Sequence, residues 1–329
     1  MQTVFYTFLI KCAQKRFFLD KFCIYSSYLL VNSTFLITFA IHIRHFGKAF
    51  AYQLIEHYPE KTLLKNIYYI LILCVLCSSC GFKLKSNDNA SDPSNMKVER
   101  YDRLESRYVV TGDFSALQQM NTEYPIETRT LVEKILRIGD VSNHDISEQF
   151  LRFYQDSTLQ TLVSDVELEY ANMDDINQDL QKVFTNLKKW IPDMPLPHVY
   201  AQIGALDQSI VVGNRTIGIS LDKYMGAKYH IYEKFGYRKD QLEQMNRSYI
   251  VPDCTLFYLL SLYPMDNFDT RNQLERDLHM GKMMWVTNKA LGTDLFRTEY
   301  VQMINRYMKK HGKKTIKQLL ESDDYKDMK

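Results

Sequence analysis

Cysteine is nearly absent from the larger part of this sequence. Five of the six cysteines lie at or before Cys80, and only Cys254 follows it. The chain beyond residue 80 can therefore form no internal disulfide. A single cysteine is most often a small buried hydrophobe, and no histidine lies close to Cys254 in the sequence to activate it as a nucleophile. We expect Cys254 to lie in the core.

Motifs that would hold a metal or support catalysis are also missing. A zinc site of the metallopeptidase kind needs two histidines four positions apart on a helix, with a glutamate between them that activates water. No His-Glu-x-x-His occurs in the chain. There is no glycine-rich phosphate-binding loop, and the run Gly218–Asp222 lacks the second glycine of a nucleophile elbow. The sequence predicts no cofactor, no metal and no recognisable enzyme activity.

An excess of charge of one sign is missing as well. The net charge is +2, and 8 of the 41 basic and 3 of the 39 acidic residues precede Cys80, which leaves 33 and 36 from there onward. Proteins that bind nucleic acid need a basic surface to neutralise phosphates, so we expect no nucleic-acid partner. Lys309-Lys310 and Lys313-Lys314 are typical of a solvated helix end.

What the sequence does contain is a bacterial lipoprotein signal. Two lysines, Lys61 and Lys65, precede the apolar run Ile67–Cys77, which ends in Ser78-Ser79-Cys80. The run covers roughly half of a ~30 Å hydrocarbon core, which is too short for a stable membrane span. We therefore predict a signal peptide over residues 61–79 and a lipid attached to Cys80. The alternative is a short buried helix or a poor transmembrane segment.

The chain around this signal divides into further segments. Residues 1–60 hold 14 of the 41 Phe and Tyr residues, and they are interpreted as an upstream extension from a misplaced start codon. A longer leader, or a transmembrane helix over Tyr28–Ile43, is the alternative. Residues 80–96 are rich in Ser, Asn and Asp and are predicted to be a flexible tether. Residues 97–329 are predicted to form a single domain.

The periodicity of residues 97–329 predicts an α+β fold that is mostly helical. An apolar stripe that begins at Ile176 and ends at Trp190 indicates a long helix over Met173–Ile191. The period then changes to that of strands, and we predict a small antiparallel β-meander over residues 197–205, 209–212 and 216–221. An edge strand is expected at Val98–Leu104. Gly281 lies within a predicted helix, Arg271–Leu291, and marks a close contact with a neighbouring element.

The order of several short motifs resembles a known family. Leu221-Asp222-Lys223-Tyr224-Met225-Gly226 is followed about two dozen residues later by Ile250-Val251-Pro252-Asp253, and then by Gly281-Lys282 in a helix. This combination resembles the gliding-motility lipoprotein family GldB of Bacteroidota, over most of residues 80–329. The resemblance implies a membrane-anchored lipoprotein of the cell envelope with an accessory or structural role, acting within an envelope protein complex.

That family is in turn distantly similar to zinc metallopeptidases, whose helix after the sheet carries the His-Glu-x-x-His motif. The matching helix here, Asp253–Leu262, contains neither histidine nor glutamate. The resemblance therefore implies a metallopeptidase-like scaffold without metal. A hydrolase-like enzyme, or a peptide- or glycan-binding module that uses the degenerate cleft, is the alternative function.

Four residues of the resembling motifs are candidate binding residues: Asp222, Tyr224, Tyr249 and Asp253. Each also has a structural interpretation, because Asp222 can end a strand and Asp253 can cap a helix. The tyrosines suit an interface, and they suit the packing of a loop onto the core equally well. The Gly-Phe-Lys-Leu-Lys-Ser sequence after Cys80 lacks an early acidic cluster, so we expect the domain to face the periplasm.

Overall fold

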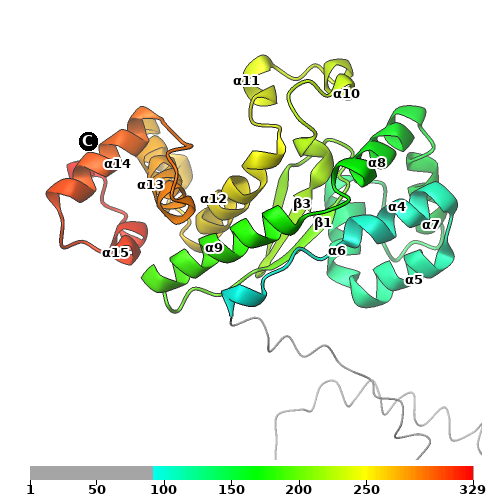
Figure 1. Ribbon diagram of the computed structural model, residues 1–329, viewed down its shortest axis with the longest axis horizontal. Helices are drawn as coiled ribbons and strands as arrows, with labels where there is room; N and C mark the ends of the chain where they lie inside the picture. The colour runs from blue at the N-terminus through cyan, green and yellow to red at the C-terminus, as the bar shows by residue number, and fades with distance from the viewer. Residues whose placement is uncertain (1–91, 329) are drawn as a thin grey trace, which may run out of the picture. The chain divides into compact units, whose positions relative to one another are not determined.

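The computed structural model describes residues 92–328, so the predicted signal peptide and Cys80 lie outside the described residues. Twelve helices, several short 3₁₀ turns and one three-stranded sheet make up the described part, and α13, α14 and α15 lie at the end away from the sheet (Figure 1). The predicted α+β, mostly helical class is confirmed, whereas the metallopeptidase-like scaffold stays a prediction. None of the described helices is both long and apolar enough to cross a membrane.

The first described residues already belong to the packed part of the protein. The 3₁₀ turn η2 (Pro93–Asn95) lies beside α9, and the Met96 carbonyl accepts a hydrogen bond from the Gln181 side chain at 2.8 Å. The expected strand at Val98–Leu104 is wrong, because only Glu99 pairs with β1 and a helix, α4, begins at Tyr101. Tyr101, Tyr108 and Val109 are spaced for one helical face and are buried, and this packing overrides the strand-like local pattern.

A group of helices follows α4 and packs beside it, as Figure 1 shows at one end of the sheet. The π-helical turn η3 directly continues α6, so the two form one helical segment. Their bounds are α4 Tyr101–Thr111, α5 Phe114–Glu123, α6 Pro125–Arg129, η3 Thr130–Ile135, α7 Ile146–Phe153 and α8 Ser157–Glu169.

The long predicted helix is confirmed as α9, Asp174–Trp190. Its stripe of apolar residues is buried from Ile176 to Leu187, and two acidic residues begin it while two lysines end it, as the helix dipole favours. The helix packs against α12 (Ile250–Leu262) and α13 (Gln273–Leu291), and the rings of Phe184 and Tyr258 lie 5.9 Å apart.

The three strands form where they are predicted, but the antiparallel meander is wrong. The strands are β1 (His198–Gln202), β2 (Ile210–Gly213) and β3 (Thr216–Ser220), in the order β1-β3-β2. The β2–β3 hairpin is antiparallel, whereas β1 pairs with β3 in parallel. β3 lies at the centre of the sheet, β1 and β2 form its edges, and β2 is the most exposed of the three strands.

The remaining elements complete a single hydrophobic core. The predicted close contact at Gly281 is confirmed, because a Cβ atom there would lie 2.7 Å from the Tyr300 Cβ of α14. The bounds of these elements are η4 Leu221–Tyr224, α10 His230–Lys234, α11 Lys239–Leu242, η5 Arg247–Tyr249, η6 Phe268–Thr270, α14 Glu299–Lys310, α15 Ile316–Glu321 and η7 Lys326–Met328.

Candidate functional site

The fold brings two of the four predicted binding residues into direct contact. The Tyr224 hydroxyl, from η4, donates a hydrogen bond of 2.8 Å to Oδ2 of Asp253 in the first turn of α12. Burial raises the pKa of Asp253 to about 6, although the bond from Tyr224 acts in the opposite direction. The two motifs, about two dozen residues apart in the sequence, therefore meet where the turn after β3 packs against the start of α12.

Asp222 serves a different partner in the same region. Its carboxylate is fully buried and accepts hydrogen bonds from the backbone N–H groups of Gly204 at 2.8 Å and Leu206 at 2.5 Å. Both amides belong to the turn between β1 and β2, in which Leu206 has a positive φ of 66°. Burial raises the pKa of Asp222, while the two backbone bonds lower it. Asp222 thus fixes the turn that carries the chain from β1 to β2.

A second buried carboxylate, which the sequence reasoning missed, joins helix α4 to the same turn. Glu105 is fully buried, its Oε2 accepts from the Ile203 N–H at 2.8 Å, and its Oε1 lies 2.9 Å from the Tyr154 hydroxyl. The same hydroxyl lies 2.7 Å from the Ile203 carbonyl. A tyrosine has one hydroxyl proton and a carbonyl can only accept, so a protonated Glu105 satisfies all three groups. Burial raises the pKa of Glu105 well above its usual value, which agrees with a neutral acid.

Two tyrosine hydroxyls hold the backbone of the turn η4, which carries Asp222 and Tyr224. Tyr232 donates to the Asp222 carbonyl at 2.7 Å, and Tyr170 donates to the Tyr224 carbonyl at 2.7 Å. Tyr249 is half-buried, ends η5 and packs against the core. The hydroxyls of Tyr170 and Tyr232 therefore hold the segment Asp222–Tyr224 against the core. We refer to Glu105, Tyr154, Asp222, Tyr224 and Asp253 as the β3–α12 junction.

A groove of about 400 Å³ lies beside the junction, between α9, the start of α12 and the end of α13. Its walls carry charges of both signs: Asp179 and Lys182 on α9, and Asp294 and Arg297 after α13. Ser248 and Pro252 line it, one position before Tyr249 and Asp253 respectively. Tyr249 and Asp253 are thus next in sequence to residues that line the groove, but their own side chains lie on a different face of the helical segment from the one that lines it.

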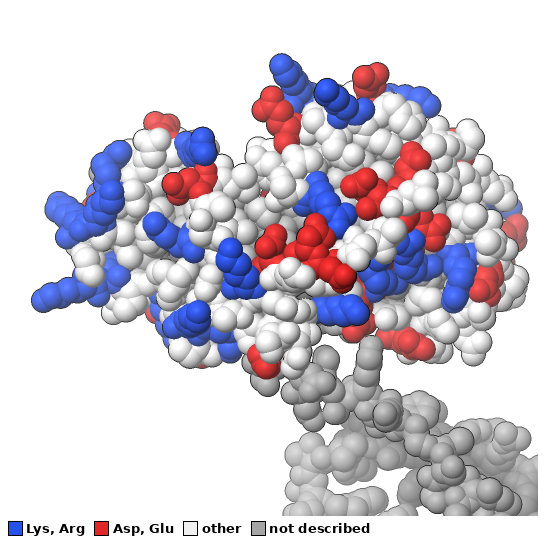
Figure 2. Space-filling view, viewed as in Figure 1, with Lys and Arg blue, Asp and Glu red and all other residues white. Residues whose placement is uncertain are grey.

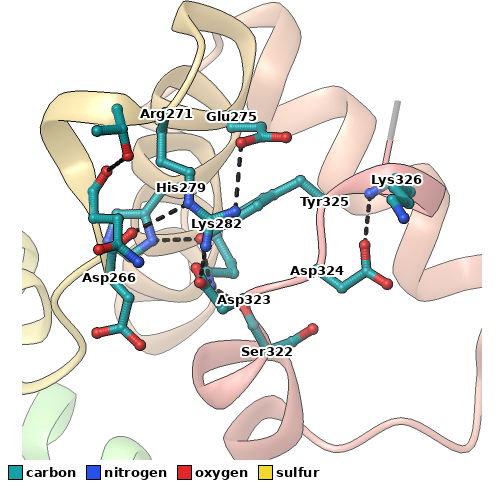
Figure 3. A network of polar contacts seen from close by, with 12 residues as sticks. Asp266, Arg271, Glu275, His279, Lys282, Ser322, Asp323, Asp324, Tyr325 and Lys326 are labelled. Carbon is teal, nitrogen blue, oxygen red and sulfur yellow. Dashed lines mark hydrogen bonds and ion pairs between the residues drawn. The ribbon is translucent and has the colours of Figure 1, made fainter.

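A second polar network connects α13 to the C-terminal end of the chain (Figure 3). The Lys282 side chain is buried, and its Nζ donates to the carbonyls of Leu320 at 3.3 Å and Ser322 at 2.7 Å. It also donates to the Tyr325 hydroxyl at 3.3 Å, which lies 2.8 Å from Nδ1 of His279. Burial lowers the pKa of Lys282 to about 8.

The same network holds a neutral histidine and an ion pair near its rim. Burial, and secondarily the neighbouring ammonium of Lys282, lowers the pKa of His279 to about 4. Arg271 pairs with Asp323 and stacks its guanidinium over the Tyr325 ring. We refer to Arg271, His279, Lys282, Asp323 and Tyr325 as the C-terminal cluster. The cluster attaches the last residues of the chain to α13.

Two further expectations concern metal and thiol chemistry. Within residues 92–328 no three His, Cys, Asp or Glu side chains converge in a way that could hold a metal ion. Cys254 is buried as expected, and burial raises the pKa of its thiol well above the usual value. The lipid-attachment prediction at Cys80 lies outside the described residues.

Comparison with known protein families identifies a match over much of the chain. The family model described as gliding motility protein GldB matches residues 83–295, which is about two thirds of the chain. The match contains the whole β3–α12 junction and ends before α14. No curated protein and no solved structure matches the chain.

Proposed function

We propose that this chain, which belongs to the gliding motility protein GldB family, acts as a lipid-anchored accessory or structural component of a bacterial cell-envelope machine. The family gives the connection to gliding motility. The predicted signal, with Cys80 directly after Ser78-Ser79, supports the anchor.

One observation carries the accessory role: the carboxylates of the family-like motifs serve the protein itself. Asp222 binds two backbone amides, and Asp253 accepts from Tyr224. Residues that hold a fold together in this way suit a component that acts through its surface. The domain would then contribute binding and placement within a larger assembly, and its scaffold would be the metal-free relative of a metallopeptidase.

The test is membrane fractionation combined with pull-down from native membranes. Cys80→Ala should leave the protein unprocessed or release it from membranes, because buried acyl chains each contribute about 0.8 kcal/mol per CH₂ group. Cys77→Ala, three residues earlier, is the matched control and should fractionate like the wild type. Unchanged acylation and fractionation of Cys80→Ala, or a lipidated protein that associates with no envelope protein, would contradict the proposal.

A second candidate function, a peptide- or glycan-binding role, is favoured by the groove. Its size lies within the range of small-ligand sites, and its lining combines charged with apolar side chains. Lys182→Glu should weaken binding of any partner that enters the groove, whereas Lys189→Glu, on the same helix and outside the groove lining, should not. Equal binding by both variants would exclude the groove as the site.

We also propose that the domain faces the periplasm. Protease added to intact cells should leave it uncut, and permeabilising the outer membrane should allow its digestion. Digestion in intact cells would place the domain on the cell surface.

A further inference from the structure

The segment that follows the family match has a one-sided charge. Between Tyr300 and Leu320 there are six Lys and Arg residues and no Asp or Glu, although acidic and basic residues nearly balance in the whole chain. The six are Arg306, Lys309, Lys310, Lys313, Lys314 and Lys317.

The fold separates these six cations into two groups. Lys314 donates to the Tyr307 hydroxyl at 2.7 Å, and Lys317 pairs with Asp193 at 2.7 Å. The other four are exposed, and none of them forms an ion pair within residues 92–328. We call these four residues, Arg306, Lys309, Lys310 and Lys313, the basic surface. Figure 2 shows blue side chains gathered at the α14 end of the molecule.

The basic surface is held on a fixed support. The face of α14 opposite to its cations is buried, through Val301, Ile304 and Tyr307. The backbone of α14 comes close to α13 at Gly281. The C-terminal cluster attaches the end of α15 and the residues that follow it to α13, through the hydrogen bonds of Lys282. The four cations are therefore presented by packed elements.

We propose that the basic surface binds the anionic phosphate headgroups of the membrane in which the chain is anchored, a step that rests on the proposed lipid at Cys80. Each Lys or Arg near an anionic bilayer contributes about 1 kcal/mol of attraction. The twelve residues 80–91 can span at most about 40 Å, so the anchor keeps the surface at a high effective concentration near the lipid. Four weak contacts then suffice to orient the domain.

A membrane fits these observations better than a nucleic acid. The cations lie at one end of a domain in which acidic residues outnumber basic ones, 36 to 33 from Cys80 onward, so they do not form the extended basic track that a polyanion requires. A flat array of phosphates needs only a local group of exposed cations. The interaction would also be sensitive to salt, because exposed charges are screened over about 10 Å at 0.1 M ionic strength.

The test uses the full lipidated chain, reconstituted in vesicles of phosphatidylcholine alone or with one third phosphatidylglycerol. Lysine reactivity toward an amine-directed label is read by mass spectrometry. Labelling of Lys309, Lys310 and Lys313 should fall several-fold in the anionic vesicles only, and should recover in high salt. Lys234 and Lys239 on the α10–α11 segment are the internal reference and should not change.

Variants separate the surface from the anchor. The double variant Lys309→Glu, Lys310→Glu should lose the protection of Lys313, and the control Lys234→Glu, Lys239→Glu should keep it. Equal labelling in both vesicle types would overturn the proposal, as would protection by a soluble polyphosphate without protection by anionic vesicles. Retention of the chain by neutral vesicles tests the lipid anchor separately from the basic surface. A chain retained only by anionic vesicles would contradict the proposed lipid anchor and support the proposed role of the basic surface. A chain retained by neither kind of vesicle would contradict both proposals.

Discussion

The β3–α12 junction buries acidic side chains and the C-terminal cluster buries a lysine, and the hydrogen-bond partners of these groups are of opposite kinds. In the junction, Glu105 and Asp222 accept hydrogen bonds from backbone N–H groups of the turn between β1 and β2. In the cluster, Lys282 donates to carbonyls at the end of α15. A buried polar group must be hydrogen-bonded, and each region meets this need with main-chain groups that its own secondary structure leaves unpaired. The position of a turn or helix end thus decides which charge can be buried beside it.

The difference gives the two regions opposite responses to pH. Asp253 has a raised pKa in the folded protein, so its stabilising contribution is present at low pH and is lost as pH rises from about 4 to about 6. His279 has a lowered pKa, so its contribution is present at neutral pH and is lost as pH falls from 6.5 to about 4. Mild acid should therefore favour the junction and weaken the C-terminal cluster.

The largest loss of stability is expected when the buried carboxylate of Asp222 is removed. Asp222→Ala leaves the amides of Gly204 and Leu206 buried without an acceptor, and each unsatisfied group costs about 1–3 kcal/mol. We expect the free energy of unfolding to fall by about 2–5 kcal/mol, measured by urea denaturation. Asp207→Asn is the control in the same turn, where the side chain is exposed, and it should cost less than about 1 kcal/mol. Equal losses would mean that Asp222 does not hold the turn.

Removing the cation of the C-terminal cluster should have a smaller and more local effect. Lys282→Met leaves the carbonyls of Leu320 and Ser322 without a donor, but it also removes a buried charge, so about 1–3 kcal/mol is expected. Amide hydrogen exchange should accelerate over residues 316–328 and remain unchanged in the junction. Lys289→Met, exposed on the same helix, is the control. A uniform acceleration across the domain would show that the cluster supports the whole fold.

The opposite pH responses form the third prediction, on the order of 1 kcal/mol in each region after allowance for solvent screening. Between pH 7 and pH 5, amides of residues 316–328 should lose protection and amides of α12 should gain it. His279→Gln should abolish the acid loss at the C-terminus, because the side chain can no longer be protonated. Asp253→Asn should abolish the acid gain in α12.

These two variants also serve as controls for one another. His279→Gln should leave the response of α12 unchanged, and Asp253→Asn should leave that of the C-terminus unchanged. If either variant alters both responses, the two regions titrate as one unit, which would contradict their independent and opposite pH responses.

The smallest effect is expected at Glu105. Because a protonated acid satisfies Tyr154 and Ile203, Glu105→Gln keeps one acceptor and one donor in place, and should change stability by less than about 1 kcal/mol at pH 7. Glu105→Ala, which removes both, is the comparison and should cost several times more by the same urea measurement. A glutamine as costly as the alanine would show that Glu105 is ionised in the folded protein.

Local patterns in the sequence were sufficient for several elements and for part of the site. The stripe and the terminal charges of α9 lie within one stretch of chain, so periodicity alone predicts the helix. Gly281 marked the approach of α14, and the motifs that hold Tyr224 and Asp253 were recognised before the contact between them was known. The family itself follows from the same short motifs, and the family match confirms it.

The contacts that the sequence could not give are those between distant segments. Strand order and direction depend on contacts between segments that are separate in the sequence, so the parallel pairing of β1 with β3 cannot be read from alternation. Glu105 meets Ile203 across 98 positions and Lys282 meets Ser322 across 40, and neither partner carries a local signal of the other. Sequence by itself determined most of the elements and the family, and it predicts the lipid anchor at Cys80. Only the tertiary structure decided which charges are buried, because burial depends on backbone groups that distant parts of the chain bring to them.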